Sequence, residues 1–287
     1  MRAKVLVFDS GVGGLSVYKE VLRQNPSIEP YYLFDNAFYP YGTKAEVQVT
    51  DRVCEVLSAF IKRYAPDLIV IACNTASTVA LGLVRNLTSI PVVGVVPAIK
   101  PAAAKTLNGI IGLLATPATV GRAYTAELIK KYAANVEVLK IGSSRLVDLA
   151  EQKLAGKPCA LNDIADVLRP WLELEKNKRP DTVILGCTHF PHLAPEIKAV
   201  WPEVNLVDSG EAIGRRVKSL LKLSDEVAPK VINLVSGKAF CTDLSRVNAN
   251  LRTALGVFGF NSIEEFALGA NSEHIVSRET LFSHTKL

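Results

Sequence analysis

Two cysteines stand in matching sequence contexts and could carry out proton chemistry. Residues 66–75 and 180–189 share one layout: Pro-Asp, four mostly aliphatic residues, a small residue, a cysteine and polar residues. Cys73 and Cys187 occupy the same place in it, each before an expected helix start that favours a thiolate. Two thiols facing one carbon from opposite sides could remove a proton on one face and return a proton on the other, which inverts a stereocentre.

The other three cysteines, Cys54, Cys159 and Cys241, give no reason to depart from the role of small, mostly buried side chains. The total of five is odd, the spacings are wide and no C-x-x-C pattern occurs. Neither a disulfide framework nor a zinc site is therefore expected, and we predict free thiols.

Polar residues beside the two thiols are natural partners for proton movement. Asp9 ends an aliphatic run, and His189 follows Cys187 by two positions. A Cα proton beside a carboxylate is very weakly acidic, so its removal demands a base of matched pKa and exclusion of water. Asp9 could also cap a helix, and His189 could make only a local hydrogen bond. We favour the functional role for His189.

Aliphatic segments alternate with segments of helical periodicity. Strands are expected at 5–8, 31–34, 68–72, 91–96, 110–115, 136–140, 183–186 and 205–207. Helices are expected from 15 to about 24, and at 53–64, 76–87, 120–132, 145–154, 162–174, 192–200 and 211–221. One more strand and helix are indicated by 231–235, 244–255 and 263–266. This alternation is typical of mostly parallel sheets flanked by helices, so the expected fold class is α/β.

The pattern also predicts two similar α/β domains, because 5–9 pairs loosely with 111–116 as the two cysteine segments pair with each other. We expect a first domain of 1–97 plus 208–265, a second domain of 98–207 and a C-terminal tail of 266–287. Ligands of open α/β sheets bind at the carboxyl ends of the strands. The active site is therefore expected in the cleft between the domains.

The polar turns at these strand ends suit a small carboxylate, because helix N-termini offer unpaired N–H groups to anions. Gly11 and Gly13 resemble a dinucleotide fingerprint, but Ser16 stands where the third glycine belongs and no Walker lysine follows. We expect instead that the glycines let backbone N–H groups approach a carboxylate closely.

Composition narrows the partners and the compartment. The net charge is +5, but Lys and Arg are scattered, so nucleic acid is not the default partner. No apolar run approaches the roughly 18 residues of a membrane helix, and the apolar run near the N-terminus is too short for a signal peptide. We expect no membrane association and a cytoplasmic location.

Four motifs in combination resemble glutamate racemase, within the Asp/Glu racemase superfamily. They are Asp-Ser-Gly-Val-Gly-Gly at 9–14, Tyr-Pro-Tyr-Gly at 39–42, Cys-Asn-Thr-Ala-Ser at 73–77 and Gly-Cys-Thr-His-Phe-Pro at 186–191. The resemblance runs over about 1–215. It implies an isomerase that needs no cofactor or metal, interconverts L- and D-glutamate by a two-base mechanism, and supplies D-glutamate for bacterial peptidoglycan.

The same resemblance assigns roles to individual residues. Cys73 and Cys187 are the two thiol acid/bases, Asp9 and His189 assist them, and Glu151 supports the proton transfer on the histidine side. Substrate contacts fall on Asp9, Ser10, Tyr41, Gly42, Asn74, Thr75, Thr116, Thr119, Thr188 and His189. Two departures are visible: His192 stands where family members commonly carry leucine, and the chain extends past the region that the resemblance covers.

Three other readings stay open on the sequence alone: an aspartate-type racemase of the same superfamily, a non-catalytic carboxylate-binding module, and a redox protein that uses the two thiols. The expected small-molecule partner is glutamate. Candidate further partners are a second copy of the chain in a homodimer and a cell-wall precursor as effector. The sequence fixes neither of them.

Overall fold

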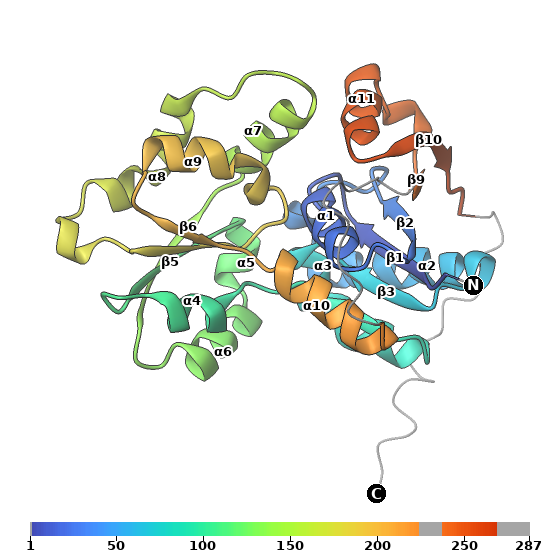
Figure 1. The fold of residues 1–287 in the computed structure, drawn as a ribbon, viewed down its shortest axis with the longest axis horizontal. Helices are drawn as coiled ribbons and strands as arrows, with labels where there is room; N and C mark the ends of the chain where they lie inside the picture. The colour runs from blue at the N-terminus through green and yellow to red at the C-terminus, as the bar shows by residue number, and fades with distance from the viewer. Residues whose placement is uncertain (1, 224–236, 269–287) are drawn as a thin grey trace, which may run out of the picture.

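The computed structural model describes residues 2–223 and 237–268, which form two sheets side by side, with helices on both faces of each (Figure 1). The described strands of the first sheet are β1 (Lys4–Asp9), β2 (Glu29–Phe34), β3 (Leu68–Ile71), β4 (Val92–Gly94), β9 (Gly237–Cys241) and β10 (Phe260–Glu265). Those of the second sheet are β5 (Ile110–Ala115), β6 (Glu137–Gly142), β7 (Thr182–Leu185) and β8 (Asn205–Val207). We call each sheet with its helices a lobe.

The two sheets share one topology. The order β2-β1-β3-β4 in the first sheet corresponds to the order β6-β5-β7-β8 in the second, and all the described pairings are parallel. β9 and β10 extend the first sheet beyond β2. The predicted α/β fold, with two similar parallel sheets flanked by helices, is confirmed.

The central strands of each sheet deliver polar residues to one edge. β1 lies beside β3, and β5 lies beside β7, with their carboxyl ends level. Asp9 and Cys73 therefore emerge together from the first sheet, and Thr116 and Cys187 emerge together from the second.

The sheets bury side chains on both faces, as period-two alternation requires. Val5 and Val7 pack with α1 (Leu15–Gln24) and α10 (Gly210–Leu221), while Leu6 and Phe8 pack with α2 (Glu46–Tyr64) and α3 (Asn74–Leu87). In the second lobe, α4 (Ile99–Lys105) and α6 (Ala123–Tyr132) cover one face. α7 (Arg145–Leu154), α8 (Leu161–Leu172) and α9 (Ala194–Val200) cover the other.

The remaining described elements are short or lie near the C-terminus. They are the 3-10 turns η1 (Tyr41–Thr43), η2 (Lys176–Lys178), η3 (Phe190–Leu193) and η4 (Leu244–Arg246), and the helices α5 (Pro117–Gly121) and α11 (Ala249–Val257). α5 lies at the junction of the lobes and contacts α3 and η1. The segment predicted as 231–235, and the tail from 269 to 287, lie outside the described residues.

Several helices differ from the prediction for local reasons. The helix expected at 120–132 is interrupted at Arg122, whose backbone is extended and joins α5 to α6. The helix expected at 192–200 is a 3-10 turn followed by α9; Pro191 and Pro195 each stand at the start of one of these pieces, where a missing N–H is tolerated. The short helix α4 was not predicted.

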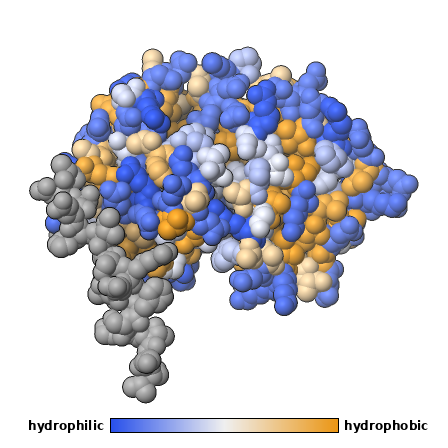
Figure 2. Space-filling view, turned by 180° about the vertical axis from the view of Figure 1, so that it is seen from behind, coloured by the Kyte–Doolittle hydropathy of each residue, from blue (hydrophilic) through white to orange (hydrophobic). Residues whose placement is uncertain are grey.

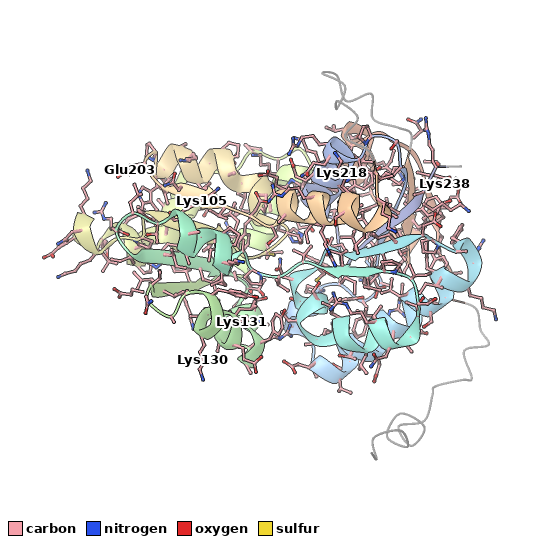
Figure 3. All side chains as sticks on the ribbon, turned by 60° about the horizontal axis from the view of Figure 1, so that its bottom comes forward. Lys105, Lys130, Lys131, Glu203, Lys218 and Lys238 are labelled. Carbon is pink, nitrogen blue, oxygen red and sulfur yellow. The ribbon has the colours of Figure 1, made fainter. Side chains whose placement is uncertain are left out.

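The surface of the molecule mixes polar and apolar residues over the face seen in Figure 2. Charged side chains such as Lys130, Glu203 and Lys238 project outward from both lobes (Figure 3). Within the described part of the chain, every helix is too short or too polar to traverse a bilayer.

The packing of β9 gives a stability prediction. Phe240 is fully buried, and its ring centroid lies 4.8 Å from that of Tyr64 and 5.5 Å from that of Phe60. Phe240→Ala should lower the free energy of unfolding by about 3–5 kcal/mol in urea denaturation. Leu107→Ala, at a side chain that is 92% exposed, is the control and should change it by less than about 0.5 kcal/mol. A loss below about 1 kcal/mol for Phe240→Ala would contradict the packing of β9 in the core.

Candidate active site

Cys73 lies two residues beyond the end of β3 and caps α3. Its sulfur accepts a hydrogen bond from the Ala76 N–H at 3.4 Å and lies 3.5 Å from the Ser10 hydroxyl. Burial raises the pKa of the Cys73 thiol to about 12, the negative charge of Asp9 adds to the rise, and the Ser10 contact opposes it. The predicted support of a thiolate by the helix start is present, but burial outweighs it. Cys73 is therefore a thiol at neutral pH.

Cys187 lies two residues beyond the end of β7 and has a different neighbour. The 3-10 turn η3, and not an α-helix, comes next, so the prediction that an α-helix start would serve this sulfur is wrong. The Cys187 sulfur instead lies 3.8 Å from Nδ1 of His189. An imidazole at this position can exchange a proton with the thiol.

His189 connects Cys187 to Glu151 on α7. Its Nε2 lies 2.6 Å from Oε1 of Glu151, while Nδ1 faces the sulfur. Burial alone would lower the pKa of His189, but the contacts with Cys187 and Glu151 raise it well above the usual 6.5. His189 therefore holds a proton more tightly than a free imidazole does, and a chain of contacts runs from Cys187 through the imidazole to Glu151.

The glycine-rich turn after β1 is shaped around this imidazole. A Cβ on Gly13 would lie 2.4 Å from Nδ1 of His189, so a side chain at position 13 would displace the ring. A Cβ on Gly11 would lie 3.0 Å from the ring of Tyr39, whose centroid is 6.4 Å from that of His189. In the same turn, Gly14 N–H donates to Asp9, and the approach of the backbone at Gly11 and Gly13 to a ligand carboxylate stays a prediction.

Asp9 is fully buried, and its charge interacts with both His189 and Cys73. Its Oδ2 accepts from Gly14 N–H at 2.7 Å, and Oδ1 has no hydrogen-bond partner among the described residues. Burial raises the pKa of Asp9, and the charge of His189 opposes the rise. A buried carboxyl oxygen without a partner is available to a bound ligand or to a moving proton.

The residues expected to bind the substrate lie around the same junction. η1, α3 and α5 contact one another, which brings three predicted binding turns together. Thr116 caps α5 by accepting from Thr119 N–H, and Asn74 has a buried Oδ1 with no partner among the described residues. On these turns and at the two strand ends beside them lie Ser10, Tyr41, Gly42, Asn74, Thr75, Thr116, Thr119 and Thr188.

Three polar contacts of Arg122 at the junction were not predicted. Arg122, at the break between α5 and α6, donates to the Thr75 carbonyl at 3.0 Å and to the Thr78 hydroxyl at 2.6 Å. Its Nε also donates to Glu46 at 3.1 Å. This buried guanidinium ties the second lobe to the first helical turn of α3. The sequence marks Arg122 only as one basic residue among many.

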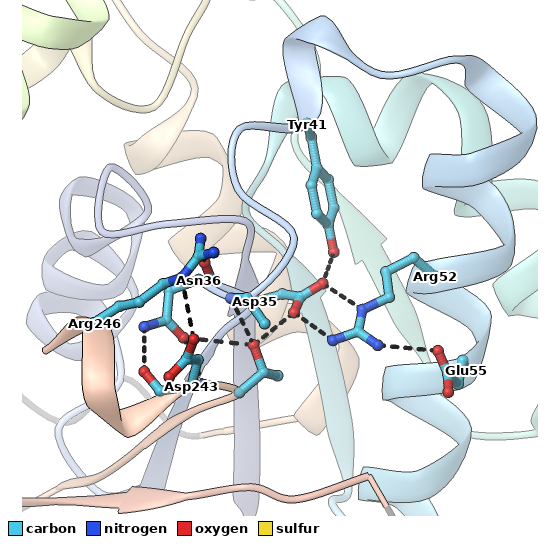
Figure 4. A network of polar contacts seen from close by, with 9 residues as sticks. Asp35, Asn36, Tyr41, Arg52, Glu55, Asp243 and Arg246 are labelled. Carbon is cyan, nitrogen blue, oxygen red and sulfur yellow. Dashed lines mark hydrogen bonds and ion pairs between the residues drawn. The ribbon is translucent and has the colours of Figure 1, made fainter.

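The hydroxyl of Tyr41 is held by a network behind the site (Figure 4). It donates to Oδ2 of Asp35 at 2.8 Å, and the same buried carboxylate accepts from Nε and Nη2 of Arg52 and from the Thr242 hydroxyl. Since this hydroxyl is already paired, Tyr41 and Gly42 would meet a ligand through their backbone. Thr242 directly follows β9 and links the C-terminal strands to η1.

Comparison with known proteins agrees with this geometry. Residues 5–217 match the family described as Asp/Glu/Hydantoin racemase. A curated glutamate racemase of Klebsiella pneumoniae is 49% identical over 268 residues, which are 93% of each chain. The chain belongs to the glutamate racemase family. The family prediction made from the four motifs is confirmed.

Solved structures of glutamate racemases share the fold. The Escherichia coli glutamate racemase, crystallised with L-glutamate and the activator UDP-MurNAc-ala, has 47% sequence identity and a TM-score of 0.86. The alignment covers 93% of this chain and 99% of that one. An isoform from Bacillus anthracis, RacE1, has 27% identity and a TM-score of 0.76, with 93% and 98% covered.

The charge on the imidazole gives a pH prediction. Burial would lower the pKa of His189, but the contacts with Cys187 and Glu151 raise it well above 6.5, so we predict a protonated ring at pH 7. Burial lowers the pKa of His192 to about 4, so we predict a neutral ring there. The ¹⁵N NMR signals of the two rings should show one imidazolium and one neutral imidazole. Glu151→Gln should lower the pKa of His189, and Glu264→Gln on exposed β10 should not. A neutral His189 ring at pH 7 in the parent protein would overturn the assignment.

Proposed function

We propose that the chain interconverts L- and D-glutamate by moving the Cα proton between two thiols, without a cofactor. The observation that carries this proposal is the delivery of Cys73 and Cys187 by equivalent strands of two similar sheets to one junction. Burial and the charge of Asp9 are the main causes of the raised pKa of Cys73, and the charge of Cys187 adds to them. Membership of the glutamate racemase family supports glutamate as the substrate.

Each thiol has its own group for proton movement. In one direction, the Cys187 sulfur takes the Cα proton and the Cys73 thiol returns a proton to the opposite face. His189, held by Glu151, exchanges the proton that resets Cys187, while Asp9, with its unpaired Oδ1, exchanges the proton that resets Cys73. The reverse direction uses the same groups with the roles of the thiols exchanged.

The binding turns suit an amino acid with two carboxylates. The N–H groups at the start of α3 and the hydroxyl groups of Thr116 and Thr119 can hold one carboxylate, and Thr188 with the backbone of Tyr41 and Gly42 can hold the other. Asp9 and the Asn74 carbonyl oxygen are acceptors for the ammonium group. These donors and acceptors come from both lobes, so a bound substrate would contact both lobes at once.

The wider role follows from the family. We propose that the chain supplies D-glutamate for peptidoglycan in the cytoplasm, and that a cell-wall precursor acts as its effector. The support is the E. coli enzyme, which was crystallised with the activator UDP-MurNAc-ala. A homodimer stays a prediction.

The domain limits are also a proposal. We place residues 1–97 with 208–265 in the first domain and 98–207 in the second. The support is that β9 and β10 pair in the first sheet and that α10 packs against α1.

The two-thiol mechanism is tested by exchange at Cα. In heavy water, the parent protein should incorporate deuterium at Cα of both glutamate enantiomers. Cys73→Ser and Cys187→Ser should each lower racemisation by at least about 10³-fold, because removal of one acid/base loses its full contribution. Cys54→Ser, on α2, is the matched control and should keep the parent rate.

The outcomes separate the alternatives. Parent-like racemisation by either variant at Cys73 or Cys187 would rule out the two-thiol mechanism. Exchange with aspartate but not with glutamate would assign the aspartate-type reaction. Binding of glutamate without any exchange would leave a carboxylate-binding module.

A further inference from the structure

Two hydrogen bonds cross between the lobes on either side of His189. The Ser16 hydroxyl, on α1, donates to the Thr188 carbonyl at 2.8 Å. The His192 ring, on η3, places Nε2 3.0 Å from the Gly13 carbonyl oxygen. One bond therefore holds the residue before His189, and the other holds the glycine on which the His189 ring lies.

The donor in each of these two hydrogen bonds follows from the chemistry of the groups involved. A carbonyl oxygen only accepts, so His192 must carry its hydrogen on Nε2. Burial lowers the pKa of His192 to about 4, which leaves a neutral ring with one N–H at neutral pH. The Ser16 hydroxyl also lies 3.0 Å from the Gly13 carbonyl, but it has one hydrogen to give. Because His192 donates to the Gly13 carbonyl, the Ser16 hydroxyl can donate to the Thr188 carbonyl.

Besides the contact with Gly13, His192 has contacts with two further side chains. Its carbonyl accepts from Nζ of Lys153, which lies on α7 two residues after Glu151. Its ring meets the ring of Phe258, at the end of α11, edge-on, with centroids 6.1 Å apart. His192 therefore links two elements of the site: its backbone carbonyl contacts the helix that carries Glu151, and its ring contacts the turn that carries Gly13.

The His189 ring has little freedom between these contacts. Its Nδ1 must face the Cys187 sulfur while Nε2 stays 2.6 Å from Glu151. The backbone of Gly13 lies so close that no Cβ would fit. A small shift of the turn after β1 would therefore change the distance and angle between Nδ1 of His189 and the Cys187 sulfur.

We propose that Ser16 and His192 are positioning residues for proton transfer at Cys187. Together they hold the turn after β1 against the turn after β7, so that His189 keeps its orientation toward the Cys187 sulfur. The expected effect on the rate of proton transfer rests on the proposed racemase function. The expected effect on the orientation of the His189 ring rests on the geometry alone.

The half-reaction at Cys187 can be singled out by isotope effects. The two enantiomers have equal free energy, so any variant must lower kcat/KM equally in both directions. The deuterium isotope effect measured with Cα-deuterated glutamate can differ between the two enantiomers. If proton transfer at Cys187 becomes slower, the effect rises for the enantiomer that Cys187 deprotonates and does not rise for the other.

The experiment uses Ser16→Ala, His192→Leu and the conservative His192→Gln, with Ser58→Ala on the exposed side of α2 as control. Cys187→Ser first identifies which enantiomer this thiol deprotonates. His192→Leu should lower kcat/KM about fivefold, the usual effect of one hydrogen bond, and should raise the isotope effect for that enantiomer only. Ser16→Ala should act in the same direction. His192→Gln, whose amide can still donate to Gly13, should restore part of the loss.

The His189 ring provides a readout that needs no turnover. In ¹⁵N NMR spectra, His192→Leu should shift the His189 ring signals, and Ser58→Ala should not. Equal changes of the isotope effect for both enantiomers, or His189 signals identical to the parent, would overturn the positioning role. If the parent protein does not racemise glutamate, the proposed function fails, and the NMR signals alone decide the positioning role.

Discussion

The position of the His189 imidazole is the constraint on which the site depends. One nitrogen must meet the Cys187 sulfur, the other must meet Glu151, and the flat face must lie on Gly13. Gly13 belongs to the first lobe, whereas His189 and Glu151 belong to the second. The two lobes must therefore meet with little tolerance, and the hydrogen bonds of Ser16, His192 and Arg122 across the junction are consistent with this need.

The fold is nearly symmetric, but the two thiols are not equivalent. Cys73 lies at the start of a long helix, with Ser10 and Asp9 near it, while Cys187 has the imidazole of His189 for a neighbour. A helix N-terminus stabilises an anion by about 0.3–1 kcal/mol, whereas full burial can shift a pKa by 3–5 units, which is several kcal/mol. Burial therefore decides the state of Cys73. The duplicated sheet supplies the geometry, and different side chains supply the proton exchange on each side.

Much of this arrangement is readable from the sequence because it is local. Aliphatic runs that end in Cys73 and Cys187 identify the strands and the strand ends, and the residues beside them name the polar partners. The contacts of Ser16 and His192 could not be predicted, because they join residues that lie far apart in the chain and have no periodic pattern. The 3-10 turn after Cys187 was missed for the opposite reason: Pro191 and Pro195 change the local backbone within a segment that otherwise resembles one helix.

The most direct measurement is a crystal structure of the protein with glutamate bound. Two thiols that act on opposite faces require the glutamate Cα to lie between the sulfurs of Cys73 and Cys187, each within about 3.5 Å, the separation of reacting atoms in a near-attack geometry. The His189 ring should still contact Gly13 and Glu151 in that complex. A Cα with both sulfurs on one side, or with one sulfur out of reach, would contradict the two-thiol mechanism.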